Sequence, residues 1–222
     1  MTVSDFISAL RSELDDKPSN AVNRLWSDLE LAGYLDEGLN RICRETLVLK
    51  RPYTISVVAS TSDYSLDARI VGIDRVQPSG RGPLTKRTTA QMDALYGEWR
   101  THTAGVPRVY IEDTATDAIT FYQTPSADEA MTVTAFTLPL IPVVSDASIA
   151  MSMVIELDDV YLEGVRYWCL YRAYDKRDVE TLRPEKSAEN RQRYDRFVDE
   201  MKRWLNRTRG ADGFNVFHRG FF

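Results

Sequence analysis

The pattern of hydrophobic and polar positions is most informative between Leu157 and Leu205, where it predicts two consecutive helices. In the first, LDDVYLEGVRYWCLYRAYDKRD, apolar residues fall on almost every helical face from Val160 to Tyr174. A helix that is apolar all round is covered on several sides in a globular protein. The second, PEKSAENRQRYDRFVDEMKRWL, is polar apart from one stripe, and it begins with Pro184, which suits a first helical turn. We predict a central helix and an amphipathic helix that covers it.

Two more helices are predicted at the N-terminal end of the chain. Residues 3–16 carry apolar side chains on one face at helical spacing. A second helix follows Ser27 and runs to about Leu49, and Ser27 and Glu30 form a capping-box pattern. Gly38 lies inside this helix, where it costs about 1 kcal/mol relative to Ala. A close contact with another helix at Gly38 would explain this glycine.

Between these helical regions the period changes from 3.6 to two, which predicts strands. A turn is expected at SGRGP (79–83), a short helix at 88–99 with Thr88 or Thr89 as its cap, and a hairpin turn at 114–117. The expected strands are 53–57, with 64–66 as its continuation, 70–76, 108–113, 118–123 and 131–138.

This order of elements predicts an α+β fold, because the helices stand at both chain ends and the strands form a block between them. We expect a bundle of about four helices with an inserted antiparallel β lobe. The expected organisation is a single domain over 1–206, with a helical part at 1–50 and 150–206 and a β-rich insertion at 51–149. Residues 207–222 lack a helical period and are predicted to form an extended tail.

Composition and charge limit the classes of function that the protein can have. The chain has 222 residues, 43% hydrophobic and 27% charged, which is typical of a globular protein. Its net charge of -5 argues against a surface that grips nucleic acid throughout, but it is compatible with a protein that surrounds DNA without holding it. No basic leader and no uncharged apolar run of about 20 residues is present, so we expect a soluble protein without membrane contact.

The sequence contains few residues and motifs of the kinds that act in catalysis or in metal binding. His102 and His218 are the only histidines, and no H-x-x-H spacing exists. No G-x-S-x-G elbow is present, and Cys43 and Cys169 are expected to be buried free thiols. The segment GRGP at 80–83 lacks the features of a phosphate-binding loop. We therefore predict no enzyme activity, no metal and no cofactor.

Two pairs of neighbouring carboxylates invite comparison with catalytic dyads. They are Asp15-Asp16 and Asp158-Asp159, and each pair falls at a predicted helix end. Carboxylates at a helix N-terminus cap free NH groups and complement the helix dipole, which explains Asp158-Asp159 without catalysis.

The C-terminal segment combines aromatic and basic residues in a stretch too short to bury them on itself. Such a cluster is typical of a docking peptide, although termini are also often tied down on their own domain. We predict that this segment binds a partner. The predicted docking residues are Arg209, Phe214, Phe217, Arg219, Phe221 and Phe222.

Three stretches resemble the head-to-tail adaptor (connector or head completion) proteins of tailed bacteriophages. WSDLELAGYLDEGLNRICRE (26–45) resembles the first long helix of that family. GVPRVYIEDTATDAITFYQTP (105–125) resembles its hairpin between two prolines. ELDDVYLEGVRYWCLYRAYDKRDVETLRPEKSAENRQRYDRFVDEM (156–201) resembles its closing helix pair, and it is the most specific of the three.

The resemblance implies a virion structural protein at the head–tail interface, made in the host cytoplasm. Such adaptors form a ring, commonly of twelve copies, beneath the portal protein. DNA passes through the ring without sequence-specific binding, and the ring is a platform for the tail or the next connector protein. The family's C-terminal segment often clasps the portal, which fits residues 207–222. In a ring, the mixed-charge face of 184–206 and the acidic face of 1–16 are candidate complementary surfaces.

Two other functions stay open at this stage. A DNA-binding regulator would use the Arg-rich segment 172–209 and would bind free duplex DNA with a steep salt dependence. A small hydrolase would need two acidic residues that converge in a pocket of the β part.

Overall fold

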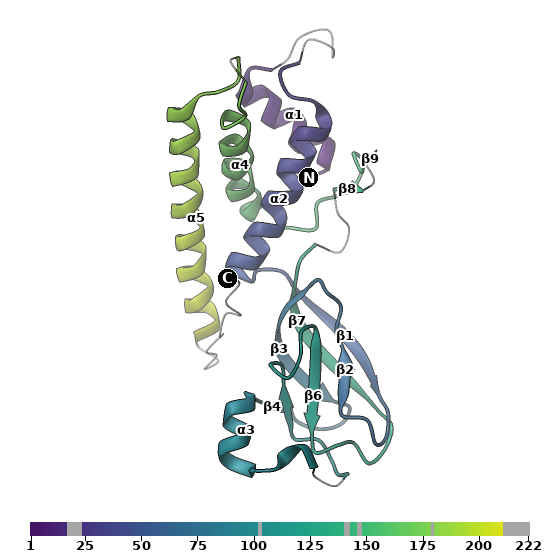
Figure 1. The fold of residues 1–222 in the computed structure, drawn as a ribbon. Coiled ribbons are helices and arrows are strands. Elements are labelled where there is room, and N and C mark those ends of the chain that lie inside the picture. The colour runs from purple at the N-terminus through teal and green to yellow at the C-terminus, as the bar shows by residue number, and fades with distance from the viewer. Residues whose placement is uncertain (17–23, 102–103, 140–142, 146–147, 179, 211–222) are drawn as a thin grey trace. The chain divides into compact units, whose positions relative to one another are not determined.

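The protein folds into two compact units, each described here by itself. The computed structural model describes residues 1–16, 24–101, 104–139, 143–145, 148–178 and 180–210. Of the described residues, the helical unit combines Met1–Leu49 with those between Leu138 and Gly210, and the β unit is Lys50–Thr137. Helices from both chain ends and an inserted strand block confirm the predicted α+β class (Figure 1).

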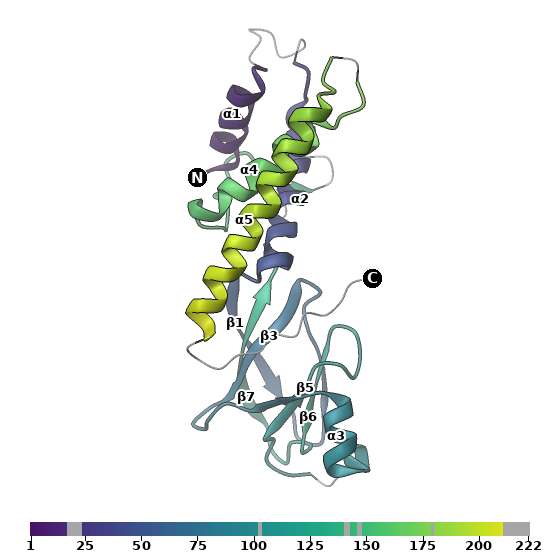
Figure 2. The ribbon, with the colours of Figure 1, turned by 90° about the vertical axis from the view of Figure 1, so that its left-hand side faces the viewer.

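The helical unit is organised around one helix. This helix, α4, makes the most extensive contacts with the other three helices, so it is the predicted central helix, although α2 also contacts every other helix of the unit. In Figure 2, α5 crosses in front of α4 and α2. Val160 departs from the predicted all-round burial, because its side chain is 67% exposed. The elements of this unit are α1 (Val3–Leu14), α2 (Asp28–Thr46), α4 (Asp159–Tyr174), α5 (Pro184–Gly210) and the two-residue strands β8 (Val144–Ser145) and β9 (Ser148–Ile149).

Two glycines let the helices of this unit approach closely. A methyl group on Gly38 of α2 would lie 3.0 Å from Val165 of α4, so the predicted close contact is confirmed. A methyl group on Gly164 of α4 would lie 2.5 Å from the ring of Phe197 in α5. Helix α4 therefore packs tightly against α2 on one side and α5 on another.

Of the two N-caps predicted for the long helices, the one at Ser27 is confirmed and the one at Asp158 is not. Ser27 caps α2 with a complete capping box, in which its hydroxyl accepts from the Glu30 amide at 3.1 Å and Glu30 accepts from the Ser27 amide at 2.8 Å. Asp158 occupies the N-cap position of α4, but its side chain makes no capping hydrogen bond, so the prediction is wrong on that point. Its side chain is exposed, and the helix dipole still favours a carboxylate there.

The β unit contains two sheets and a short helix. One sheet has the order β1-β7-β3, in which both pairs are antiparallel, and the other has the order β2-β6-β5-β4. Thr88 caps the short helix α3, as predicted. The elements are β1 (Lys50–Val57), β2 (Asp63–Ser65), β3 (Ile70–Pro78), β4 (Thr85–Arg87), α3 (Thr89–Tyr96), a 3-10 turn at Trp99–Thr101, β5 (Val109–Ile111), β6 (Ala118–Tyr122) and β7 (Glu129–Thr137).

Several predictions about this unit need correction. Strand β2 does not continue β1; it pairs with β6 in the other sheet. The lobe is not purely antiparallel, because β4 pairs in parallel with β5. Strand β4, with the sequence TKR, carries no alternating apolar residues and so gave no strand signal. The insertion ends at Thr137 and not at residue 149, since β8 and β9 contact α2 within the helical unit.

The predicted extended tail also begins later than expected. Helix α5 continues to Gly210, so residues 207–210 are helical. The Thr208 hydroxyl donates a hydrogen bond to the carbonyl of Leu205 at 3.0 Å, and the Leu205 side chain is buried. Buried Leu205 therefore packs this part of α5 on the helical unit. Residues 211–222 lie outside the described part of the chain.

Candidate interaction surfaces

The junction between α1 and α2 is held by a buried ion network. Arg11 is 5% exposed, and its guanidinium pairs with buried Asp16 and, at 2.6 Å, with Asp28. It also donates to the carbonyl of Trp26 at 2.8 Å. Asp16 in turn accepts from the Leu25 amide at 3.0 Å. The predicted Asp15-Asp16 pair is thus structural, with Asp16 tying the end of α1 to the start of α2.

A second cluster joins α2, α4 and α5 through stacked aromatic and guanidinium groups. The Trp168 ring of α4 lies 4.3 Å from the guanidinium carbon of Arg41 and 5.2 Å from that of Arg191. Tyr194 lies beside Trp168 and donates to a Glu45 carboxylate oxygen at 3.2 Å. Burial is the main cause that raises the pKa of Tyr194, with Glu45 adding to it. Arg191 of the Arg-rich segment and Arg41 of α2 therefore both stack on the helical core.

The two cysteines behave as predicted. Cys43 and Cys169 are free and buried. Burial raises the pKa of the Cys169 thiol, which keeps the thiol protonated and unreactive. Neither cysteine has the exposed, electropositive surroundings of a nucleophile.

Of the predicted docking residues, Arg209 lies in the described part of the chain. It stands in the last turn of α5, and its guanidinium donates to the carbonyl of Leu47 at 2.7 Å. Leu47 is the left-handed C-cap of α2, so Arg209 ties the end of α5 to the end of α2. The other predicted docking residues, Phe214, Phe217, Arg219, Phe221 and Phe222, lie outside the described residues.

An open groove of about 510 Å³ runs along the seam between α4 and α5. Val160 and Tyr167 line it from α4, and Phe197 and Met201 line it from α5. Trp204, one turn beyond Met201, is 47% exposed. Val160 was predicted to be part of the core, and Trp204 was not predicted to be exposed. The sequence feature that could have revealed this surface is the spacing of Phe197, Met201 and Trp204. These residues follow one another at steps of four and three, which places them on one helical face.

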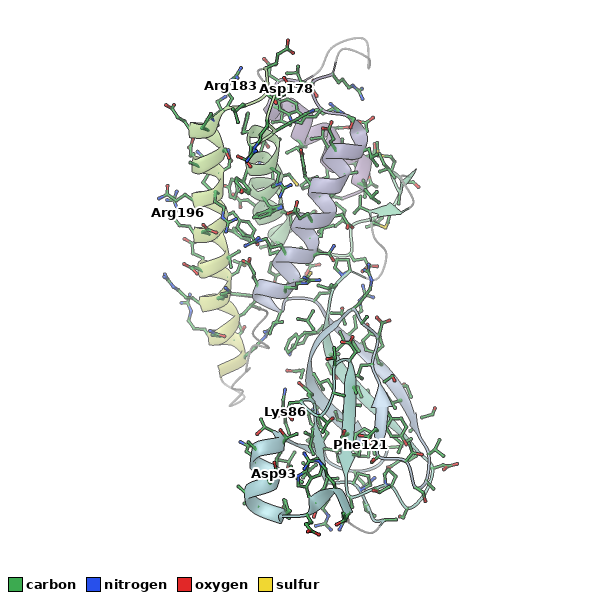
Figure 3. The ribbon with its side chains drawn as sticks, in the orientation of Figure 1. Lys86, Asp93, Phe121, Asp178, Arg183 and Arg196 are labelled. Atoms are coloured by element: carbon green, nitrogen blue, oxygen red, sulfur yellow. The ribbon has the colours of Figure 1, made fainter. Side chains whose placement is uncertain are left out.

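The charged lining of this groove is mixed. Arg193 and Arg196 of α5 and Glu163 and Glu200 line it. Arg193 pairs with Glu189 at 2.5 Å, whereas Arg196 makes no ion pair with any described residue. Figure 3 shows Arg196 projecting from α5 on the side away from α1 and α2. The groove thus combines large apolar side chains with charges of both signs, among which Arg196 has no ion pair within the described residues.

A smaller pocket of about 250 Å³ lies in the β unit. Its walls include Asp63, Thr120, Phe121 and Trp99. The two carboxylate oxygens of Asp63 accept hydroxyl hydrogen bonds from Thr120 at 2.5 Å and Ser62 at 2.8 Å. Among the described residues, Asp63 is the single carboxylate in the lining, so this pocket lacks the acidic pair that the hydrolase alternative requires.

The described residues contain no group of three or more His, Cys, Asp or Glu side chains placed to hold a metal ion. None of the described helices is long and apolar enough to cross a membrane.

The described residues thus form an α+β fold with ion networks that join helices and an open groove along α4 and α5. A sequence profile of the SU10 adaptor protein family matches residues 1–216. The chain belongs to this family of bacteriophage head-to-tail adaptors, which are virion structural proteins. No curated protein matches the sequence.

Proposed function

We propose that this protein is one subunit of a ring that lies beneath the portal, extends the DNA channel and carries the tail or the next connector protein. The observation that supports this most directly is the family match over residues 1–216. In this proposal the four long helices act as a bundle that builds the ring wall, and twelve copies close the ring. The role is structural and needs neither metal nor cofactor.

The charge distribution favours this proposal over a DNA-binding regulator. Arginines in the segment 172–209 are largely engaged within the protein: Arg172 pairs with Glu37 at 3.0 Å and Arg191 with Asp195 at 3.1 Å. Arg209 bonds the Leu47 carbonyl. A guanidinium that already has a partner contributes less to phosphate binding, and the net charge is -5.

Electron microscopy of the purified protein mixed with isolated portal rings tests the ring. We expect a twelve-fold density added to one end of the portal and a monomer when the protein is alone. A stable oligomer without portal would contradict assembly on a template. Tight binding to free duplex DNA that falls steeply with salt, without added density on the portal, would favour the regulator instead.

We further propose that residues 211–222 dock on the portal through their aromatic and basic side chains, with Arg209 anchoring the start of the segment on α2. Two variants test this: a chain that ends at residue 210, and a full chain in which Phe214, Phe217, Phe221 and Phe222 are replaced by Ser. Both are expected to lose portal binding in a pull-down while they keep the helical circular dichroism of the parent. Undiminished portal binding by the shortened chain would refute the docking proposal.

A further inference from the structure

The open groove between α4 and α5 has the shape and chemistry of a helix-binding surface. Its floor consists of large side chains, with Tyr167 on α4 and Phe197 and Met201 on α5. Exposed Val160 and Trp204, at 67% and 47%, extend the apolar surface. Exposed apolar patches of this kind mark interaction sites when they are contiguous. We propose that this groove binds helix α1 of a second copy of the chain, an inference that rests on the proposed ring.

The outer face of α1 matches the groove in size. Its exposed side chains are small, with Ser8, Ala9 and Ser12 in the middle of the helix. Helices pack best when large side chains on one surface meet small ones on the other, since the axes can then approach to about 8–10 Å. A helix with a bulky outer face would be held too far away to cover Phe197 and Met201.

The charges on the two surfaces also bear on the pairing of the groove with α1. The exposed charged residues of α1 and its C-cap are Asp5, Glu13 and Asp15, of which Glu13 already pairs with Arg166 of α4 at 2.9 Å, and Arg11 is buried in its ion network. The groove lining holds Arg196, which has no ion pair with a described residue of its own chain, and also the carboxylates Glu163 and Glu200. A register that places Asp5 or Asp15 opposite Arg196 brings opposite charges together, whereas one that places them opposite Glu163 or Glu200 does not, so charge directs the register of the contact.

The positions of the two surfaces allow repeated contacts between copies. Helix α4 contacts both α1 and α5, and in Figure 1 α5 lies at one flank of the helical unit while α1 lies toward the other. Different surfaces on two flanks make a heterologous interface, which closes into a ring when the rotation between copies permits. Each copy would then supply a groove to one neighbour and a helix to the other.

Mixed crosslinking tests this pairing directly. Two variants, Ala9→Cys and Met201→Cys, are mixed in equal amounts with portal rings and treated with a short bismaleimide. The native Cys43 and Cys169 are buried and do not compete. We expect a covalent dimer in the mixture and none with either variant alone, because the contact joins two different surfaces.

A charge-reversal variant in the groove and a matched control outside it give an independent test of this contact. Arg196→Glu should raise the protein concentration needed for assembly on the portal by about tenfold or more, since like charges then face each other. Arg207→Glu is the matched control, an exposed cation of the same helix that does not line the groove, and it should assemble as the parent does.

The outcomes separate this inference from the ring itself. Rings that assemble without a crosslink in the mixture overturn the groove–α1 contact and leave the proposed function intact. A crosslink with Met201→Cys alone shows that grooves face each other, and it also overturns the contact. Absence of any assembly on the portal refutes the proposed function and, with it, this inference.

Discussion

At the scale of single residues, the helical unit depends on a few positions whose surroundings permit one residue type. Gly164 is such a position, because a methyl group there would lie 2.5 Å from the Phe197 ring, and Gly38 is a less crowded one, because a methyl group there would lie 3.0 Å from Val165. Gly33, in the same helix as Gly38, faces open space. The sequence pattern marked Gly38 as unusual, but it did not distinguish the crowded glycines from the open one.

Replacement of Gly164 and of Gly33 by alanine should change the stability of the protein in opposite directions. Gly164→Ala forces the Phe197 ring to move and should destabilise the protein by about 1–3 kcal/mol. Gly33→Ala is the matched control and should stabilise the protein by about 0.4–1 kcal/mol, since alanine restricts the unfolded chain. The urea midpoints of the two variants measure this. Equal midpoints would show that the α4–α5 contact is looser than described.

The Arg11 network should be sensitive to loss of either charge. Arg11→Met leaves the Asp16 carboxylate buried without its cation and should cost about 3–5 kcal/mol of unfolding free energy. A second substitution, Asp16→Asn, should recover part of this loss, because it removes the charge and keeps an acceptor for the Leu25 amide. The exposed pair Arg193–Glu189 is the control, and Arg193→Met should cost less than about 1 kcal/mol.

At the scale of elements, caps and central packing decide where each helix begins and which face it buries. Both Ser27 and Asp158 stand at N-cap positions, yet the capping hydrogen bond is made by Ser27 and not by Asp158. Sequence identifies a residue that can cap a helix, but the rotamer it adopts depends on its neighbours. The exposed Asp158 side chain has water as an alternative partner.

This difference predicts unequal effects of removing the two side chains. Ser27→Ala breaks the capping box of α2 and should cost about 1 kcal/mol. Asp158→Ala should cost about 0.5 kcal/mol or less, because it loses an interaction with the helix dipole alone. Thermal or urea unfolding followed by circular dichroism gives both values. A larger loss for Asp158→Ala would indicate that its carboxylate caps α4 in solution.

At the scale of the whole molecule, the chain enters and leaves the β unit on neighbouring strands. Lys50 at the start of β1 pairs with Phe136 near the end of β7. Directly opposite residues in an antiparallel pair have Cα atoms about 4.5–5.5 Å apart. The unit also has its own buried core, which includes Tyr110, Phe121 and Met131. An insertion with adjacent ends and its own core has the properties of an independent domain.

Residues 50–137 should therefore fold when expressed alone. A two-dimensional amide NMR spectrum is expected to show dispersed peaks of a β-rich fold. A fragment that ends at residue 130 is the control, since it lacks most of β7, the middle strand of the β1-β7-β3 sheet, and should be unfolded. A collapsed spectrum for the complete fragment would show that this unit needs the rest of the chain.

The sequence alone was sufficient for the class of fold, the helical segments, the cap at Ser27, the free buried cysteines and the adaptor family. These features depend on local periodicity, on short-range hydrogen bonds and on residue order, all of which are present in the chain before it folds. The central role of α4 followed from the same reasoning, because a helix with apolar residues on most faces has to be covered.

Tertiary structure alone decided which segments pair and which side chains remain exposed. Strand β4 pairs through backbone groups that every residue carries, so its polar sequence gave no signal. The bond from Arg209 to Leu47 joins segments far apart in sequence, and the burial of Arg11 and the exposure of Val160 depend on how the helices pack. Long-range contacts of this kind have no period along the chain, and they decide which arginines and apolar residues remain available to a partner.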